Sequence, residues 1–117
     1  MTLTTTLAHA QTQGIDTVWT LTELNGTPFP ATTTLVFDAE GRFSGQAPCN
    51  RYSSGTAVPP PAFQAEPILS TRMACPDLDA ETAYFLALSS MTEVRITGDV
   101  MTLTNPDGDA LTFTATE

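Results

Sequence analysis

The chain has 117 residues, 41% of them apolar, with four basic residues against 13 acidic ones and a formal net charge of −9. This length suits a single domain with one hydrophobic core. Because so acidic a chain has no basic stripe to neutralise phosphates, we expect neither a nucleic-acid partner nor an anionic lipid surface, and no apolar run reaches the ~18 residues of a membrane span.

The first ten residues differ in character from the rest of the chain. They end in Ala8-His9-Ala10 before Gln11, a small-x-small pattern typical of a signal-peptidase site, although the basic and apolar regions of a full signal are missing. We therefore predict that residues 1–10 are the remnant of a secretory signal and that residues 11–117 form a single domain. The alternative is a disordered polar tail. With no cysteine near this end, we expect no lipid anchor.

Strand signals dominate the first half of the chain. Residues 17–24 alternate apolar and polar side chains and end at the turn signal Asn25-Gly26. Residues 33–46 predict a hairpin with Gly41 in its loop. The side chains predicted to face the core are Trp19, Leu21, Thr33, Leu35, Phe37 and Phe43.

The middle of the chain contains the only convincing helix. Prolines 59–61 offer no backbone donors and predict a loop or a sheet edge, and residues 63–73 are predicted to be extended. Residues 75–91 then predict a helix, with Pro76 at a favourable first position and acidic residues in the first turn. The predicted core-facing stripe of this helix is Leu78, Phe85 and Leu88.

A strand meander occupies the last third of the chain. Gly98-Asp99 and residues 105–108 are its predicted turns, and threonine alternates with apolar residues along its strands. The predicted inward positions are Val94, Ile96, Met101, Leu103, Leu111 and Phe113. Together these elements predict a mainly β (α+β) domain: a curved antiparallel sheet, or a partly open small β-barrel, with one helix packed on it.

Four sequence features are spaced along residues 18–114. They are Trp19-x-Leu21 with Asn25-Gly26, Cys49-Asn50-Arg51-Tyr52-Ser53, Thr71-Arg72-Met73-Ala74-Cys75, and the meander that starts at Val100. In this order and spacing they resemble the META domain family, also called HslJ-like, of small bacterial envelope proteins. Pro48 stands where the family often has glycine, which we expect to alter the local turn without changing the fold.

The resemblance implies a small β-rich, barrel-like domain with one helix that is secreted or anchored in the cell envelope. The family is associated with stress tolerance and envelope integrity, and it has no established enzymatic activity or cofactor. For this chain the resemblance therefore implies an exported, stress-related role.

Cys49 and Cys75 are the only cysteines in the chain. An even cysteine count in an exported chain favours a disulfide between them, which would stabilise the fold by roughly 3–4 kcal/mol in the chain-entropy model. Two buried free thiols, or a catalytic or metal-binding thiol, are the alternatives. The single histidine, His9, lies in the predicted signal remnant, so we expect neither a four-ligand zinc site nor a Cys-His nucleophile.

Asn50, Arg51 and Arg72 lie close to the two cysteines in sequence. Asn50 is predicted to shape a turn with its own side chain. In a chain of net charge −9, Arg51 and Arg72 are each expected to pair with a carboxylate, with Asp77 and Asp79 among the candidates. Alternatively, the two guanidinium groups together recognise an anionic group. All three residues are therefore candidate contacts for a ligand or partner.

These observations predict a non-enzymatic, exported, monomeric domain of the periplasm, without metal or cofactor, that contacts an unknown protein or small ligand of the envelope. The alternative is a periplasmic inhibitor or binding module whose acidic surface or proline-rich loop, residues 58–63, blocks a cationic hydrolase. An enzyme is the least supported class, because the usual catalytic side chains are missing.

Overall fold

The computed structural model describes residues 16–116 of the chain. This part contains nine strands and one helix. The predicted signal remnant, residues 1–10, lies outside this part. The strands are β1 (Val18–Leu24), β2 (Thr27–Pro28), β3 (Thr34–Phe37), β4 (Arg42–Gln46), β5 (Arg51–Gly55), β6 (Leu69–Ser70), β7 (Glu93–Thr97), β8 (Val100–Thr104) and β9 (Ala110–Thr116), and the helix is α2 (Leu78–Ser90).

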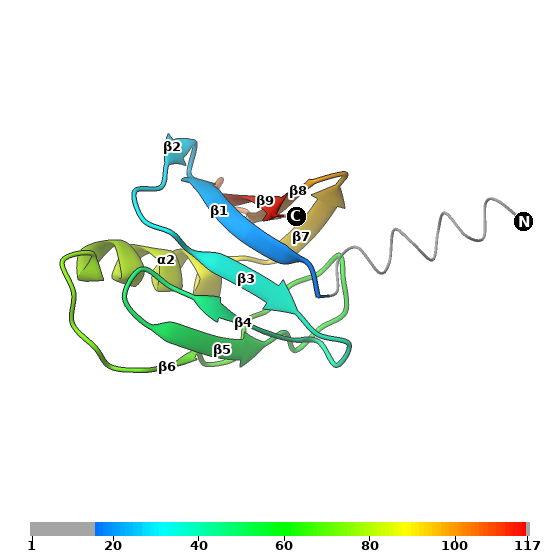
Figure 1. Ribbon diagram of the computed structural model, residues 1–117. Coiled ribbons are helices and arrows are strands. Elements are labelled where there is room, and N and C mark those ends of the chain that lie inside the picture. Colours follow the sequence, from blue (N-terminus) through cyan, green and yellow to red (C-terminus); the bar gives the residue numbers. More distant parts are fainter. Residues whose placement is uncertain (1–15, 117) are drawn as a thin grey trace, which may run out of the picture.

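All the strands belong to one antiparallel sheet in the order β6-β5-β4-β3-β1-β9-β8-β7, with β2 paired to β1. The two ends of this order, β6 and β7, do not pair with each other, so the sheet is open. Figure 1 shows the sheet bent, with β3 to β6 in its lower part, β7 to β9 at the upper right and α2 on the left. This architecture confirms the predicted mainly β fold with one helix.

Two predicted turns set the register of their hairpins. Asn25 and Gly26 both take positive φ, 53° and 81°, between the paired residues of β1 and β2. Gly98, at φ 60°, opens the two-residue turn between Thr97 and Val100, which pair across β7 and β8. Glycine takes this left-handed conformation without steric cost. Because a slip of one residue would turn every side chain of the strand to the other face, these turns also determine which residues are buried.

The core lies between the inner face of the sheet and α2. Most strand positions predicted to face inward are at most 5% exposed, namely Trp19, Leu21, Thr33, Leu35, Phe43, Met101, Leu103, Leu111 and Phe113. Phe37 and Val94 are half-buried. The prediction was wrong for Ile96, which is 39% exposed. It lies on β7, an end strand of the sheet, where the chain around the Gly98 turn extends past the core.

The helix occupies residues 78–90 rather than 75–91, and its buried face is rotated from the predicted one, with Leu88 common to both. Its buried residues are Glu81, Tyr84 and Leu88, whereas Leu78 is 41% exposed and Phe85 is half-buried. The predicted stripe did not include Glu81, which was expected only as one of the acidic residues of the first turn. Its carboxylate accepts backbone N–H groups inside the protein, and Glu81 lies on the same buried face of the helix as Tyr84.

Tyr52 and Tyr84 connect the sheet to the helix within the core. The Tyr52 hydroxyl donates to the carbonyl oxygen of Thr34 (2.7 Å), and the Tyr84 hydroxyl then donates to the Tyr52 oxygen (2.6 Å). Gly45 lies opposite Tyr52 in the β4–β5 pair, and a Cβ at this position would collide with the Thr34 carbonyl. A side chain at residue 45 would therefore displace the group that Tyr52 binds.

Alkaline titration should test this buried tyrosine pair. Burial raises the pKa of both phenols above the usual value of about 10. Because the unfolded chain then releases these protons first, the free energy of unfolding should be unaffected below pH ~10 and should fall above it, by up to about 2.7 kcal/mol per pH unit for two groups. Tyr52 and Tyr84 are the only tyrosines. The tyrosinate absorbance should therefore appear together with unfolding followed by circular dichroism, and tyrosinate formed in an intact fold would contradict the burial of this pair.

Candidate functional site

A disulfide joins Cys49, in the turn after β4, to Cys75, which precedes α2. The two Cα atoms lie 5.7 Å apart, a usual separation for a disulfide. The chain has no free cysteine. The predicted bridge is therefore present, and neither alternative, buried free thiols or a catalytic or metal-binding thiol, applies to this structure.

Asn50 is buried, and the chain itself occupies all its side-chain hydrogen-bonding positions. Its Nδ2 donates to the Met73 carbonyl oxygen (3.1 Å) and to Glu81 Oε2 (2.7 Å). Its Oδ1 accepts from Thr71 Oγ1 (2.8 Å) and from the Met73 backbone N–H (2.7 Å). Since a side-chain amide has two donor and two acceptor positions, none is left for a ligand. These contacts favour the structural interpretation of Asn50 over the ligand-contact interpretation.

Glu81 completes this arrangement from the helix. Its Oε1 accepts the backbone N–H groups of Cys49 (2.9 Å) and Asn50 (2.8 Å), and the side chain is buried, with only 4% of the residue exposed. Sequence reasoning missed this residue. The signal that could have found it is its spacing, three and seven residues before Tyr84 and Leu88, which places it on the buried face of the helix. We call Asn50, Thr71, Met73 and Glu81 the Asn50 network.

Arg51 and Arg72 lie within the segments that the disulfide and the Asn50 network hold, yet both are exposed. Among the described residues, the ion pairs are Arg42 with Glu66 (3.7 Å) and Arg95 with Glu93 (3.3 Å). The predicted pairing of Arg51 and Arg72 with Asp77 or Asp79 was therefore wrong. Exposed ion pairs contribute only about 0–1 kcal/mol, so the excess of acidic residues does not force every arginine into one.

Two adjoining grooves border the segment that carries Arg72. The first, of about 400 Å³, lies between residues 70–74 and α2, where Leu78, Glu81 and Phe85 line it. The second, of about 380 Å³, lies toward the outer face of the sheet and includes Arg51 and Leu69. Ser70 and Thr71 line both grooves. Large apolar side chains are exposed around them, with Leu69 and Met73 each 66% exposed and Leu78 41% exposed. We call residues 69–74, with Arg51, the edge surface.

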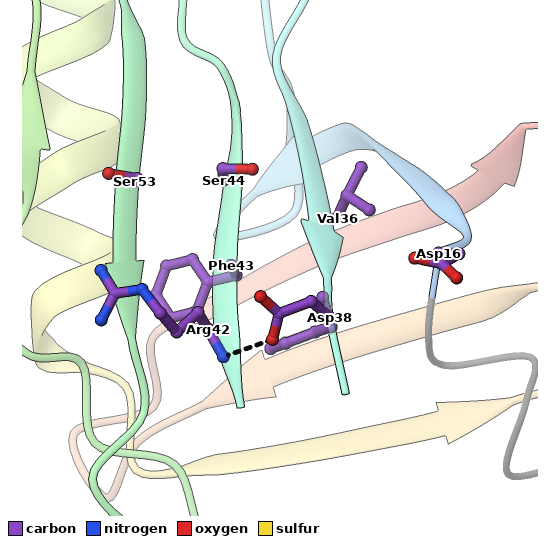
Figure 2. Close-up of a pocket in the computed structure, with 8 residues that line it drawn as sticks. Asp16, Val36, Asp38, Arg42, Phe43, Ser44 and Ser53 are labelled. Atoms are coloured by element: carbon purple, nitrogen blue, oxygen red, sulfur yellow. Dashed lines mark hydrogen bonds between the residues drawn. The ribbon is translucent and has the colours of Figure 1, made fainter. Parts of the chain in front are cut away.

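A third depression, of about 260 Å³, lies on the outer face of β3 to β5 and shares Ser44 and Ser53 with the second groove (Figure 2). Figure 2 shows Val36, Ser44 and Ser53 in a row across these strands, with Asp38 and Arg42 below that row. The Asp38 carboxylate accepts the backbone N–H groups of Glu40 (2.8 Å) and Arg42 (3.0 Å), so it stabilises the β3–β4 loop. The guanidinium of Arg42 pairs with Glu66. Asp38 and Arg42 therefore serve the fold, and none of the predicted site residues lines this depression.

The described part of the chain shows no arrangement typical of two other site classes. Within residues 16–116, no cluster of three or more His, Cys, Asp or Glu side chains is placed to hold a metal ion. The described helix α2, with 13 residues, is too short to cross a membrane.

Solved structures show the same fold. An NMR structure of a protein from Burkholderia xenovorans has a TM-score of 0.71 and 31% sequence identity, covering 92% of this chain and 87% of that chain. Another NMR structure has a TM-score of 0.67 and 22% identity over 85% of this chain and 88% of that one. A DUF4847 family protein from Bacteroides vulgatus has a TM-score of 0.59 and 13% identity over 70% of this chain and 57% of that one. The last two share the fold alone.

The sequence comparison identifies the family. No curated protein matches the chain. Residues 10–117 match the META domain, a span that includes both cysteine-containing segments, the helix and the whole sheet. This chain therefore belongs to the META domain family.

Proposed function

We propose that this META domain is a non-enzymatic, exported binding domain of the cell envelope, and that the edge surface contacts its partner during envelope stress. One observation carries the proposal. Arg51 and Arg72 are exposed and have no ion-pair partner among the described residues, while their neighbours Asn50 and Met73 are held by hydrogen bonds. Two guanidinium groups on hydrogen-bonded segments, each lining one of two adjoining grooves, suit the binding of an anionic group.

The disulfide supports the exported location. Bridges of this kind persist in oxidising compartments such as the periplasm and are rare in the cytosol. Cys49 and Cys75 together hold the segments on which both arginines lie. The same bond is therefore consistent with the proposed compartment and holds the segments that form the proposed binding surface.

The side chains of the two grooves support binding rather than catalysis. A hydroxyl nucleophile needs an adjacent base, and the carboxylate that lines these grooves belongs to Glu81. Both oxygens of Glu81 already accept hydrogen bonds, from the backbone of Cys49 and Asn50 and from the Asn50 side chain. The guanidinium and aliphatic groups of the grooves suit recognition of an anionic and partly apolar partner.

A periplasmic inhibitor of a cationic hydrolase is the alternative, and the loop at residues 58–63 favours it. Pro59, Pro60 and Pro61 are exposed, whereas Phe63 is buried and anchors the loop. An exposed, proline-stiffened loop in a chain of net charge −9 fits a basic partner. Saturable, salt-sensitive binding to a basic periplasmic hydrolase that tolerates loss of Arg51 and Arg72 would favour this alternative over the edge surface.

Complementation in the organism that encodes the chain should test the proposed function. A strain without the gene should be sensitive to detergent or high osmolarity, and the full chain should restore resistance. The variant Arg51→Ala/Arg72→Ala should fail to restore it. The matched control Arg42→Ala/Arg95→Ala removes two exposed arginines that do have ion-pair partners, and it should restore resistance.

Both variants should accumulate to the wild-type level with the disulfide formed, because exposed substitutions change stability by about 0.5 kcal/mol or less. Equal restoration by both variants would show that Arg51 and Arg72 are not the recognition residues. A deletion strain as resistant as its parent would contradict the stress role itself.

A further inference from the structure

The sheet ends in an edge that the chain leaves open. β6 is the last strand on one side of the sheet and pairs with β5 through Leu69 and Ser70. Beyond it, the Thr71 N–H donates to the Arg51 carbonyl oxygen (3.1 Å) and the Met73 N–H donates to Asn50 Oδ1 (2.7 Å), both toward the sheet. Backbone groups of an extended segment alternate in direction, so those of residues 70, 72 and 74 point away from β5. A row of donors and acceptors is thus exposed along this segment.

The opposite edge of the sheet, at β7, is covered by another part of the chain. The Phe63 N–H donates to the Thr92 carbonyl oxygen and the Val94 N–H donates to the Pro61 carbonyl oxygen, at 2.9 and 2.8 Å. The proline-containing loop therefore covers the start of β7. Natural proteins protect sheet edges by covering them, and by keeping exposed edge strands short, charged and polar. The edge at β6 is short and carries Arg72, yet Leu69 and Met73 beside it are each 66% exposed.

The groove beside this open edge has the form of a strand-binding site. It runs between residues 70–74 and α2, with Leu78 and Phe85 on the helix side. An extended peptide in the groove would pair its backbone with residues 72 and 74 and place alternate side chains against the helix. Adding a strand to an exposed edge is a recurring mode of peptide recognition, in which the backbone supplies affinity and the side-chain pockets supply specificity.

We propose that an extended, acidic segment of another protein pairs as an added strand with residues 70–74, with its carboxylates facing Arg51 and Arg72. This proposal rests on the proposed function and specifies its partner. Charge complementarity argues for the acidic segment, because both arginines have no ion-pair partner among the described residues. The net charge of −9 repels an acidic peptide at long range, but salt screens that field beyond ~8 Å, so Arg72 in this groove and Arg51 in the adjoining groove dominate close to the edge.

A second copy of this chain fits the edge less well. Antiparallel pairing of two identical edges around residue 72 would place the two Arg72 side chains close together, and like charges on facing strands are destabilising. The partner is therefore a different protein with a carboxylate-bearing strand. A dimer in the absence of peptide, abolished by Arg72→Glu or by Ala74→Pro, would overturn this assignment.

The test uses the full chain with its disulfide formed and three synthetic peptides of about eight residues, a common strand length. The first alternates valine and threonine and contains two glutamates, the second has lysines in place of the glutamates, and the third is the glutamate peptide with alternate backbone amides methylated. The glutamate peptide should bind at least about tenfold more tightly than either of the others. On binding, the amide hydrogens of Arg72 and Ala74 should become protected from exchange.

Three variants separate charge from backbone pairing. Arg51→Glu/Arg72→Glu should reverse the preference, binding the lysine peptide about tenfold more tightly than the glutamate peptide, while Arg95→Glu should leave the preference unchanged. Ala74→Pro removes an outward-pointing N–H and should weaken binding of the glutamate peptide. Equal binding of the methylated peptide, or Arg72 and Ala74 amides that exchange as in the free protein, would overturn strand addition.

The peptide results are independent of the complementation results. If complementation requires Arg51 and Arg72 but the glutamate peptide neither binds nor protects the edge amides, the edge surface keeps its function and strand addition is wrong. If the glutamate peptide binds as expected but Arg51→Ala/Arg72→Ala restores resistance, strand addition stands and the proposed stress role of this surface is wrong.

Discussion

Replacing Glu81 with alanine should lower the free energy of unfolding by about 3–5 kcal/mol, because buried hydrogen-bond donors lose their acceptor. The carboxylate accepts the N–H groups of Cys49 and Asn50 and one arm of the Asn50 amide, at 2.9, 2.8 and 2.7 Å. A buried donor left without a partner costs about 1–3 kcal/mol, and more when the lost partner is charged. Alanine also leaves a space that the surrounding residues fill only in part.

Urea unfolding of matched variants should measure this loss. Thr82→Ala, the next position of the same helix, removes an exposed hydroxyl that bonds Leu78, and it should change stability by about 0.5 kcal/mol or less. Glu81→Gln keeps one acceptor oxygen but turns an amide N–H₂ toward groups that are themselves donors. Its loss in free energy of unfolding should therefore lie between those of Glu81→Ala and Thr82→Ala. A loss below about 1 kcal/mol for Glu81→Ala would mean that water replaces the carboxylate and that the network is not required.

The strands of the C-terminal meander could be predicted because their burial follows a local rule. Met101, Leu103, Leu111 and Phe113 alternate with threonines and are fully buried. The turn at Gly98 fixes the parity of the alternation. Ile96 obeys the same parity but is exposed, since alternation assigns a side chain to a face of the sheet and does not tell how far the core extends along that strand.

β5 was not predicted as a strand, because residues 51–55 include two serines and a glycine, which have little strand preference. Its place depends on partners distant in sequence. It pairs with β4 on one side and β6 on the other, and Tyr52 reaches across to Tyr84 in the helix. Within the same stretch, Ser54 is buried because its hydroxyl donates to the Glu66 carbonyl oxygen (2.8 Å).

The candidate site was only partly predictable, because its contacts also join residues that are distant in sequence. The sequence motifs identified Cys49, Asn50 and Cys75 as a unit, and the structure joins them. Glu81 was missed because its partners lie 31 and 32 residues earlier, and no local pattern marks a glutamate that binds backbone N–H groups. Composition suggested carboxylate partners for Arg51 and Arg72. Net charge, however, does not tell which side chains lie close together, and an exposed ion pair is too weak to hold two side chains in contact.

Loss of the Cys49–Cys75 bond should lower the free energy of unfolding by about 3.5 kcal/mol, the loop-closure value for a separation of 26 residues. Cys49→Ala/Cys75→Ala is the suitable variant, because it leaves no thiol to form intermolecular bonds. Wild-type protein unfolded in urea with a reducing agent should show the same loss as this variant without it, and the reducing agent should not change the variant. A loss below about 1 kcal/mol would show that the bridge contributes little to the stability of the fold.

A double-mutant cycle between this variant and Glu81→Ala should show how the bridge and the Asn50 network depend on each other. In the chain-entropy account the bridge acts on the unfolded chain, whereas Glu81 acts on the folded one, so the two losses should add. Their sum, about 6.5–8.5 kcal/mol, approaches the whole stability of a typical small domain, so the cycle requires a stabilising osmolyte. If the losses add, the network forms without the bridge and holds Arg51 and Arg72 in place even under reducing conditions. If Glu81→Ala costs less once the bridge is gone, the bridge maintains the network, and presentation of the edge surface depends on an oxidising compartment.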